Sequence, residues 1–174
     1  MMIAGHMKKL FVAVCAITVV LFAASCTKEK SPSGVENKSP DFTLRDMRGG
    51  KVSLAGFRGR VVLLEFWATW CPPCRESIPE LNELYKRYKD RGLVVLGISL
   101  DSEGDAASAI VSFMKEQPII YPVLIDDTKA SMLYSVSSIP ALFLIDKNGN
   151  VVKRVSGFVP GLTENLSNDI ERLL

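Results

Sequence analysis

The residues with the clearest chemical signature are two cysteines separated by two prolines, Cys71-Pro72-Pro73-Cys74. They follow an apolar stretch, residues 61–67, that is typical of a buried strand, and they precede a segment with helical periodicity. The free N–H groups and the dipole at a helix start favour a thiolate, so we expect the pKa of Cys71 to lie below the value of about 8.5 for a free thiol. Because the thiolate is the species that attacks disulfides, this placement predicts a reversible Cys71–Cys74 disulfide.

The other cysteines and the single histidine lie near the N-terminus. Cys15 is part of an apolar stretch that ends just before Cys26, and His6 precedes that stretch. Removal of the stretch would leave Cys71 and Cys74 as the thiols available for a disulfide in the folded domain. A mature chain without histidine excludes Cys–His and Ser–His–Asp catalysis, and it lacks the two further ligands that a zinc site would need. We therefore expect no metal and no cofactor.

Residues 1–26 have the features of a secretory signal: two lysines, an apolar stretch at residues 10–24, and small residues before Cys26. The stretch is too short for a comfortable transmembrane helix. The small residues before Cys26 resemble a bacterial lipoprotein box, in which the signal is cut before a cysteine that is then lipidated, although Ala23 stands where leucine is most common. We expect a lipidated Cys26, with ordinary cleavage before that residue or an uncleaved anchor as the alternatives.

Charge and composition divide the remainder of the chain into a linker and one domain. Without residues 1–26, the 21 basic side chains fall to 19 and equal the 19 acidic ones, and the absence of a basic block argues against nucleic-acid binding. Residues 27–40 are polar and contain Pro, Ser and Gly, which predicts a flexible tether. Residues 41–174 are expected to form a single domain, because their length suits one hydrophobic core.

The apolar pattern of this domain alternates between strands and helices. Residues 42–44 and 52–54 flank turn residues and predict an N-terminal hairpin. Further strands are expected at residues 61–66, 93–100, 121–125, 141–145 and 151–155, and helices at residues 73–89, 105–115, 129–134 and 164–174. This order predicts an α/β fold with a mixed central sheet covered by helices on both faces.

Three segments carry a resemblance to a known family: FWATWCPPCR (66–75), SSIP (137–140) and LIDKNGNVV (144–152). They resemble thioredoxin-fold proteins of the TlpA/ResA type, which are extracytoplasmic thiol–disulfide oxidoreductases of bacteria in the redoxin, or AhpC/TSA, superfamily. The resemblance extends over residues 39–174. It implies a thioredoxin fold with an N-terminal β-hairpin and an αβ insertion, and disulfides of other proteins as substrates.

The two thiols are expected to have different roles. Cys71 begins the helix and is the candidate nucleophile, whereas Cys74 lies one turn inside and is the candidate resolving thiol. The Cys71 thiolate would attack a partner disulfide, and Cys74 would then break the mixed disulfide and release the reduced partner.

Glu65 stands in the middle of the apolar strand, where burial would raise its pKa and let it exchange a proton near neutral pH. By resemblance it matches the buried acid of thioredoxin, which helps to deprotonate the resolving cysteine. The lysine that accompanies that acid aligns with Gly97 here. TlpA/ResA-type sequences often carry a second acid where this chain has Ser77, and the neighbouring Glu76 is expected to face elsewhere because one residue turns a helix by about 100°.

The resemblance also identifies residues that would contact a substrate. It places a cis-proline at Pro140 beside the cysteine pair, and the backbone of Ile139 would pair with an extended substrate segment there. Trp70 is expected to form part of the same surface, together with Pro72 and Pro73 between the two cysteines.

Two other functions are weighed against the oxidoreductase. A peroxidase of the related peroxiredoxins generally has Thr or Ser three residues before its reactive cysteine, where this chain has Ala68. A copper-binding or assembly module would accept two thiolates, but related copper-delivery proteins use a wider cysteine spacing plus a histidine. By resemblance we expect a monomeric, membrane-anchored, periplasm-facing reductant, for example in cytochrome c maturation, that is recharged by a membrane thiol donor.

Overall fold

One seven-stranded mixed sheet forms the centre of the computed structural model, which describes residues 37–101 and 105–174. The strand order is β2-β1-β5-β4-β3-β6-β7. Strand β4 is parallel to β3 and β5, and all other neighbours are antiparallel. The strands are β1 (Thr43–Asp46), β2 (Lys51–Ser53), β3 (Val61–Trp67), β4 (Leu93–Ser99), β5 (Val123–Ile125), β6 (Ala141–Ile145) and β7 (Val151–Ser156).

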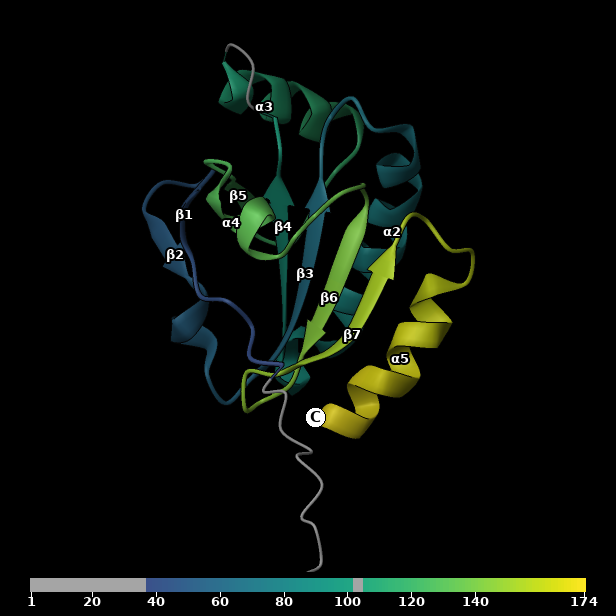
Figure 1. The fold of residues 1–174 in the computed structure, drawn as a ribbon. Coiled ribbons are helices and arrows are strands. Elements are labelled where there is room, and N and C mark those ends of the chain that lie inside the picture. Colours follow the sequence, from purple (N-terminus) through teal and green to yellow (C-terminus); the bar gives the residue numbers. More distant parts are fainter. Residues whose placement is uncertain (1–36, 102–104) are drawn as a thin grey trace, which may run out of the picture. The chain divides into compact units, whose positions relative to one another are not determined.

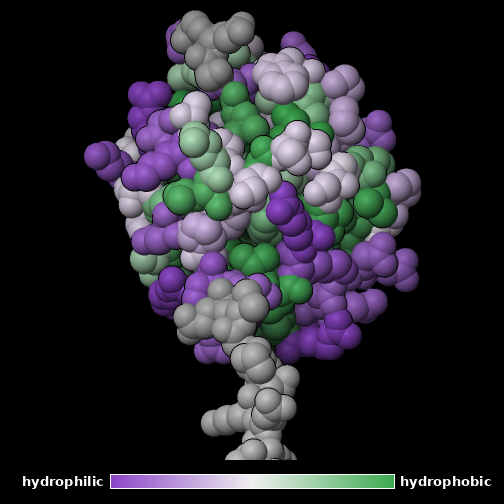
Figure 2. All heavy atoms as spheres, in the orientation of Figure 1, coloured by the Kyte–Doolittle hydropathy of each residue, from purple (hydrophilic) through white to green (hydrophobic). Residues whose placement is uncertain are grey.

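Helices cover both faces of the sheet, as the sequence predicts. The α-helices are α2 (Pro72–Tyr88), α3 (Ala106–Glu116), α4 (Lys129–Leu133) and α5 (Leu162–Leu173), and the short 3-10 helices are η1 (Leu54–Phe57) and η2 (Lys89–Arg91). In Figure 1, α4 lies in front of the sheet and α2 behind it. Figure 2 shows the same side in space-filling form, with hydrophobic patches interrupted by hydrophilic residues. Two hydrophobic clusters, one on each face, make up the core.

The central strand β3 divides its side chains between these two clusters because successive residues of a strand point to opposite faces. Val61, Leu63 and Trp67 belong to the cluster that contains residues of α2, α3 and α5. The side chains that alternate with them, those of Val62, Leu64 and Phe66, belong to the cluster on the α4 side. Glu65 lies an even number of residues from Leu63 and Trp67, so its side chain points to the same face of the sheet. The strand therefore directs its carboxyl toward α2.

Helix α2 contains a proline, Pro79, in its interior. Proline has no N–H, so the carbonyl oxygen four residues earlier, on Arg75, loses its helical partner. The side chain of Gln117, at the end of α3, donates to that oxygen at 2.5 Å. The Arg75 guanidinium in turn lies 4.6 Å from the ring centre of Phe113 on α3. These contacts attach the first turns of α2 to α3.

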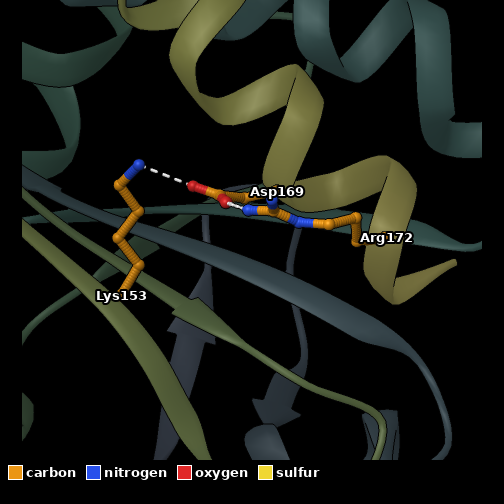
Figure 3. Close-up of polar contacts among 3 residues, drawn as sticks. All are labelled: Lys153, Asp169 and Arg172. Carbon is orange, nitrogen blue, oxygen red and sulfur yellow. Dashed lines mark hydrogen bonds and ion pairs between the residues drawn. The ribbon is translucent and has the colours of Figure 1, made fainter.

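The last helix is tied to the edge of the sheet by charged side chains (Figure 3). Lys153 of β7 donates to Asp169 of α5 at 2.5 Å, and Arg172 donates to the other oxygen of the same carboxylate. The bond from Lys153 is the largest cause of a lowered pKa at Asp169. Helix α5 therefore covers the sheet through this polar contact as well as through its buried leucines.

The end of the predicted tether is part of the folded domain. Lys38 pairs with Asn150 in an isolated antiparallel bridge, and the Ser39 N–H donates to the Gly149 carbonyl at 2.9 Å. The expectation that residues 37–40 are flexible is therefore wrong, because the β6–β7 turn supplies hydrogen bonds that no local pattern reveals. Cys26, the predicted signal at residues 1–26 and the rest of the tether lie outside the described residues. Within the described residues, no helix has both the length and the apolar character needed to span a membrane.

The predicted elements are confirmed, with their ends displaced by a few residues. The strand expected at residues 121–125 begins only at Val123. Pro122 has no N–H for a sheet ladder, and the Tyr121 side chain is fully buried in the cluster on the α2 side. Tyr121 therefore lies outside the regular strand, and its side chain is free to contribute to the candidate site.

Candidate active site

The cysteine pair is joined in a disulfide at the start of α2, immediately beyond the end of β3. The Cα atoms of Cys71 and Cys74 are 5.4 Å apart. Cys71 is the N-cap of the helix, and the Cys74 N–H donates to its sulfur at 3.3 Å. Cys71 retains 3% exposure and Cys74 none, so the outer thiol is the one open to a partner. An N–H aimed at the Cys71 sulfur also favours its thiolate over its thiol.

The loop that leads into the cysteine pair is held by a buried carboxylate. Asp101 follows β4, and it accepts hydrogen bonds from the Thr69 N–H at 3.0 Å and the Thr69 hydroxyl at 2.6 Å. The hydroxyl of Ser99 donates to it at 2.6 Å. Because the parallel strands β3 and β4 end at the same edge of the sheet, the residue after β4 reaches the loop after β3. Asp101 thereby fixes the backbone two residues before Cys71.

Glu65 is completely buried, as the apolar run around it predicts. The Ser77 hydroxyl donates to Oε1 at 2.6 Å, and the Tyr121 hydroxyl donates to Oε2 at 2.8 Å. Burial raises the pKa of Glu65 from 4.5 to about 7, although both hydroxyls favour the ionised form and lower it. The carboxyl is therefore poised to take up or release a proton near neutral pH.

The side of the carboxyl where thioredoxin has a lysine is occupied here by an aromatic ring. Gly97 pairs with Glu65 across β3 and β4. A Cβ on Gly97 would lie 3.0 Å from the Tyr121 ring and 3.1 Å from Trp67 Nε1. The absence of a side chain at Gly97 thus makes room for Tyr121 to reach the carboxyl. The Trp67 Nε1–H beside it is buried and has no hydrogen-bond partner among the described residues.

The residues predicted to contact a substrate have different degrees of exposure. Trp70 is 67% exposed, Pro72 is exposed and Pro73 is half-buried. The Ile139–Pro140 peptide bond is cis, as expected. Ile139 packs against the cluster that contains both cysteines.

The sequence also predicts that Glu76 faces away from the site, and its side chain is exposed. It therefore does not supply a second acid. Within residues 37–101 and 105–174, no group of three or more Cys, His, Asp or Glu residues is arranged to hold a metal ion.

The sequence interpretation missed four residues that the fold brings to the site: Thr69, Ser77, Asp101 and Tyr121. Two signals could have found some of them. Ser77 follows Cys74 by three residues and therefore shares its helix face. Asp101 ends the strand next to β3 in a parallel pair, so it lies at the edge where β3 ends. Tyr121 had no such signal, because it is 56 residues from Glu65 in the chain.

Comparison with known proteins identifies the family of the chain. Residues 35–154 match the AhpC/TSA family. The thiol-disulfide oxidoreductase ResA of Bacillus cereus is 40% identical over 131 residues, which cover 75% of this chain and 73% of the relative. A putative thiol:disulfide interchange protein DsbE from Chlorobium tepidum has 36% identity and a TM-score of 0.72, covering 78% of this chain and 94% of that structure.

A second similar structure is the exposed lipoprotein thioredoxin of Streptococcus pneumoniae, with 30% identity and a TM-score of 0.67, covering 77% of this chain and all of that one (100%). The fold and the cysteine pair define a thioredoxin-fold thiol–disulfide oxidoreductase. The chain belongs to the AhpC/TSA family, within which it is a thiol–disulfide oxidoreductase of the ResA/DsbE type.

Proposed function

We propose that this enzyme reduces disulfides of other proteins, with Cys71 as nucleophile and Cys74 as resolving thiol. The Cys71 thiolate attacks one sulfur of the partner disulfide, and the other partner sulfur leaves with the electron pair. The Cys74 thiolate then attacks the Cys71 sulfur, which releases the reduced partner and closes the Cys71–Cys74 disulfide. The observation that carries this assignment is the position of Cys71 as N-cap of α2, with the Cys74 N–H aimed at its sulfur.

Glu65 is proposed as the proton acceptor for Cys74. A buried resolving thiol is a poor nucleophile until it loses its proton, and a nearby base with a pKa near 7 removes it efficiently at neutral pH. Glu65 is linked to the first turn of α2 through Ser77, whose hydroxyl contacts both the carboxyl and the Cys74 carbonyl oxygen. Its raised pKa supports this role.

The substrate surface is proposed to comprise Trp70, Pro72, Pro73 and the Ile139–Pro140 segment. Within the described residues, the backbone of Ile139 forms no hydrogen bond with the rest of the domain. An extended partner segment could therefore pair with it as an added strand. The exposed indole of Trp70 would supply apolar contact beside the disulfide.

Location and partners are proposed from the N-terminal sequence and from relatives. The small residues before Cys26 suggest a lipid anchor that holds a periplasm-facing domain at a bacterial membrane, and one similar structure is described as a lipoprotein. In an oxidising compartment the pair needs a source of electrons, so we propose a membrane thiol donor and substrates such as those of cytochrome c maturation. Cys26→Ser should release the protein from membranes or block its processing, and unchanged attachment would contradict the anchor.

Trapping of partners tests the roles of the two thiols. Cys74→Ser should accumulate mixed disulfides with partner proteins, because attack still occurs and resolution does not. Cys71→Ser should trap few or none. Equal trapping by both variants would require the roles to be reversed or abandoned.

Reduction potential and substrate assays test the direction and the alternatives. A reductant requires a Cys71–Cys74 potential below that of its substrate, and about 30 mV already corresponds to 1.4 kcal/mol for this two-electron couple. Purified protein should reduce insulin. Peroxide consumption in place of insulin reduction would favour a peroxidase, and stoichiometric bound copper would favour a copper module.

A further inference from the structure

The hydroxyl of Ser77 lies between the candidate proton acceptor and the resolving cysteine. Its oxygen is 2.6 Å from Glu65 Oε1 and 3.0 Å from the carbonyl oxygen of Cys74. Glu65, Cys74 and Ser77 all have 0% exposure, so water does not compete for these contacts. Ser77 is thus the side chain that connects the carboxyl on β3 with the cysteine turn of α2.

A serine hydroxyl has one hydrogen and here has two acceptors within reach. When Glu65 is ionised, its negative oxygen is the stronger acceptor, and the hydrogen points to Oε1. When Oε1 carries a proton, the carboxyl donates to the Ser77 oxygen, and the Ser77 hydrogen turns to the Cys74 carbonyl. Glu65 can therefore gain a proton without leaving a buried hydroxyl unpaired, which would be costly.

We propose that Ser77 is the positioning residue that presents Glu65 to Cys74, and that its hydroxyl turns from Glu65 Oε1 to the Cys74 carbonyl each time the carboxyl takes up the Cys74 proton. In this step the S–H bond of Cys74 breaks and an O–H bond forms on Glu65, while no electron pair moves between sulfurs. The Cys74 thiolate then attacks the Cys71 sulfur. The inference rests on the proposed role of Glu65 and names the residue through which that role is exercised.

Tyr121 provides a matched control. It also donates to the Glu65 carboxyl, but it comes from the segment before β5 and its hydroxyl has no contact with α2 among its hydrogen bonds in the described residues. Among the described residues, this phenol is the titratable group that forms a hydrogen bond with the carboxyl. No Lys or Arg of the described residues forms a hydrogen bond or ion pair with Glu65. Loss of either hydroxyl should raise the pKa of Glu65, but only loss of Ser77 should disconnect it from Cys74.

The test separates the two thiol steps in the reduced protein carrying Cys15→Ser and Cys26→Ser, so that Cys71 and Cys74 are the thiols that react. One equivalent of 5,5′-dithiobis(2-nitrobenzoate) gives a first release of thionitrobenzoate when Cys71 attacks and a second release when Cys74 resolves the mixed disulfide. Both phases are measured across pH for the wild type, Glu65→Gln, Ser77→Ala, Ser77→Thr and Tyr121→Phe. The infrared carboxyl band gives the pKa of Glu65 in each variant that retains it, so that second-phase rates are compared at equal ionised fractions of Glu65.

At equal ionisation, Ser77→Ala should slow the second phase by at least about 10-fold, because general acid–base assistance is typically worth more than that. Its first phase should be unchanged, Tyr121→Phe should slow the second phase much less than Ser77→Ala does, and Ser77→Thr should recover most of the rate. A Ser77→Ala rate equal to the wild type, or equal slowing by Tyr121→Phe, would overturn the positioning role. If Glu65→Gln itself left the second phase unchanged, the proposed role of Glu65 would fail instead.

Discussion

The buried carboxyl of Glu65 makes a specific contribution to the pH dependence of stability. Its pKa is about 7 in the folded protein and 4.5 as the reference for an unfolded chain. The folded protein thus binds this proton more tightly, so the contribution of Glu65 to stability is fully present below pH 4.5 and is lost as the pH rises toward 7. A difference of this size corresponds to about 3 kcal/mol of unfolding free energy.

Glu65→Gln should remove this dependence because the amide does not titrate. We therefore expect the wild type to lose about 3 kcal/mol more stability than Glu65→Gln between pH 4.5 and pH 8. Urea unfolding of the oxidised proteins at several pH values measures both free energies. The lowered pKa values of Asp146 and Asp169 act in both proteins and cancel in the comparison.

The comparison uses only the change with pH, so a constant offset from placing an amide near two hydroxyls does not affect it. Parallel stability profiles for the two proteins would refute the reasoning, since they would mean that Glu65 titrates alike in the folded and unfolded chains. A wild type that gains stability relative to the variant as the pH rises would show that the hydroxyls outweigh burial.

Three further substitutions test the elements around the site. Asp101→Ala leaves three hydrogen-bond donors without their acceptor, which should cost about 2 kcal/mol of unfolding free energy. It should also slow insulin reduction, because the loop before the cysteine pair loosens, and unchanged turnover would show that other contacts hold this loop. Gly97→Ala places a methyl group 3.0 Å from the buried Tyr121 ring, which should cost about 1–3 kcal/mol in urea unfolding; a neutral result would mean that the ring moves freely. Gln117→Ala should cost about 1 kcal/mol of unfolding free energy in the wild type, because the Arg75 carbonyl loses its donor. In a Pro79→Ala background the cost should be smaller, because the restored helical N–H pairs with that carbonyl. Equal costs in both backgrounds would contradict this compensation.

The sequence by itself determined the chemistry of the redox pair and the layered fold. Three local features are enough to place Cys71 at the start of a helix: the cysteine spacing, the apolar run before it and the helical periodicity after it. They depend on no contact with distant segments of the chain. The alternating strands and helices determine the mixed sheet, because each apolar face must be buried. An acid at Glu65, inside a run buried on both faces, already predicts a raised pKa.

Only the tertiary structure decided how that acid is held and how the pair is framed. Tyr121 and Asp101 come from separate strand ends, and their contacts with Glu65 and Thr69 depend on the lateral order of β3, β4 and β5. Hydrogen bonds between segments far apart in the chain leave no periodic signal, because one polar residue at the right strand end is enough to make them. The same reason explains why the sequence predicted a flexible segment at Lys38, where a turn more than a hundred residues away provides the partners.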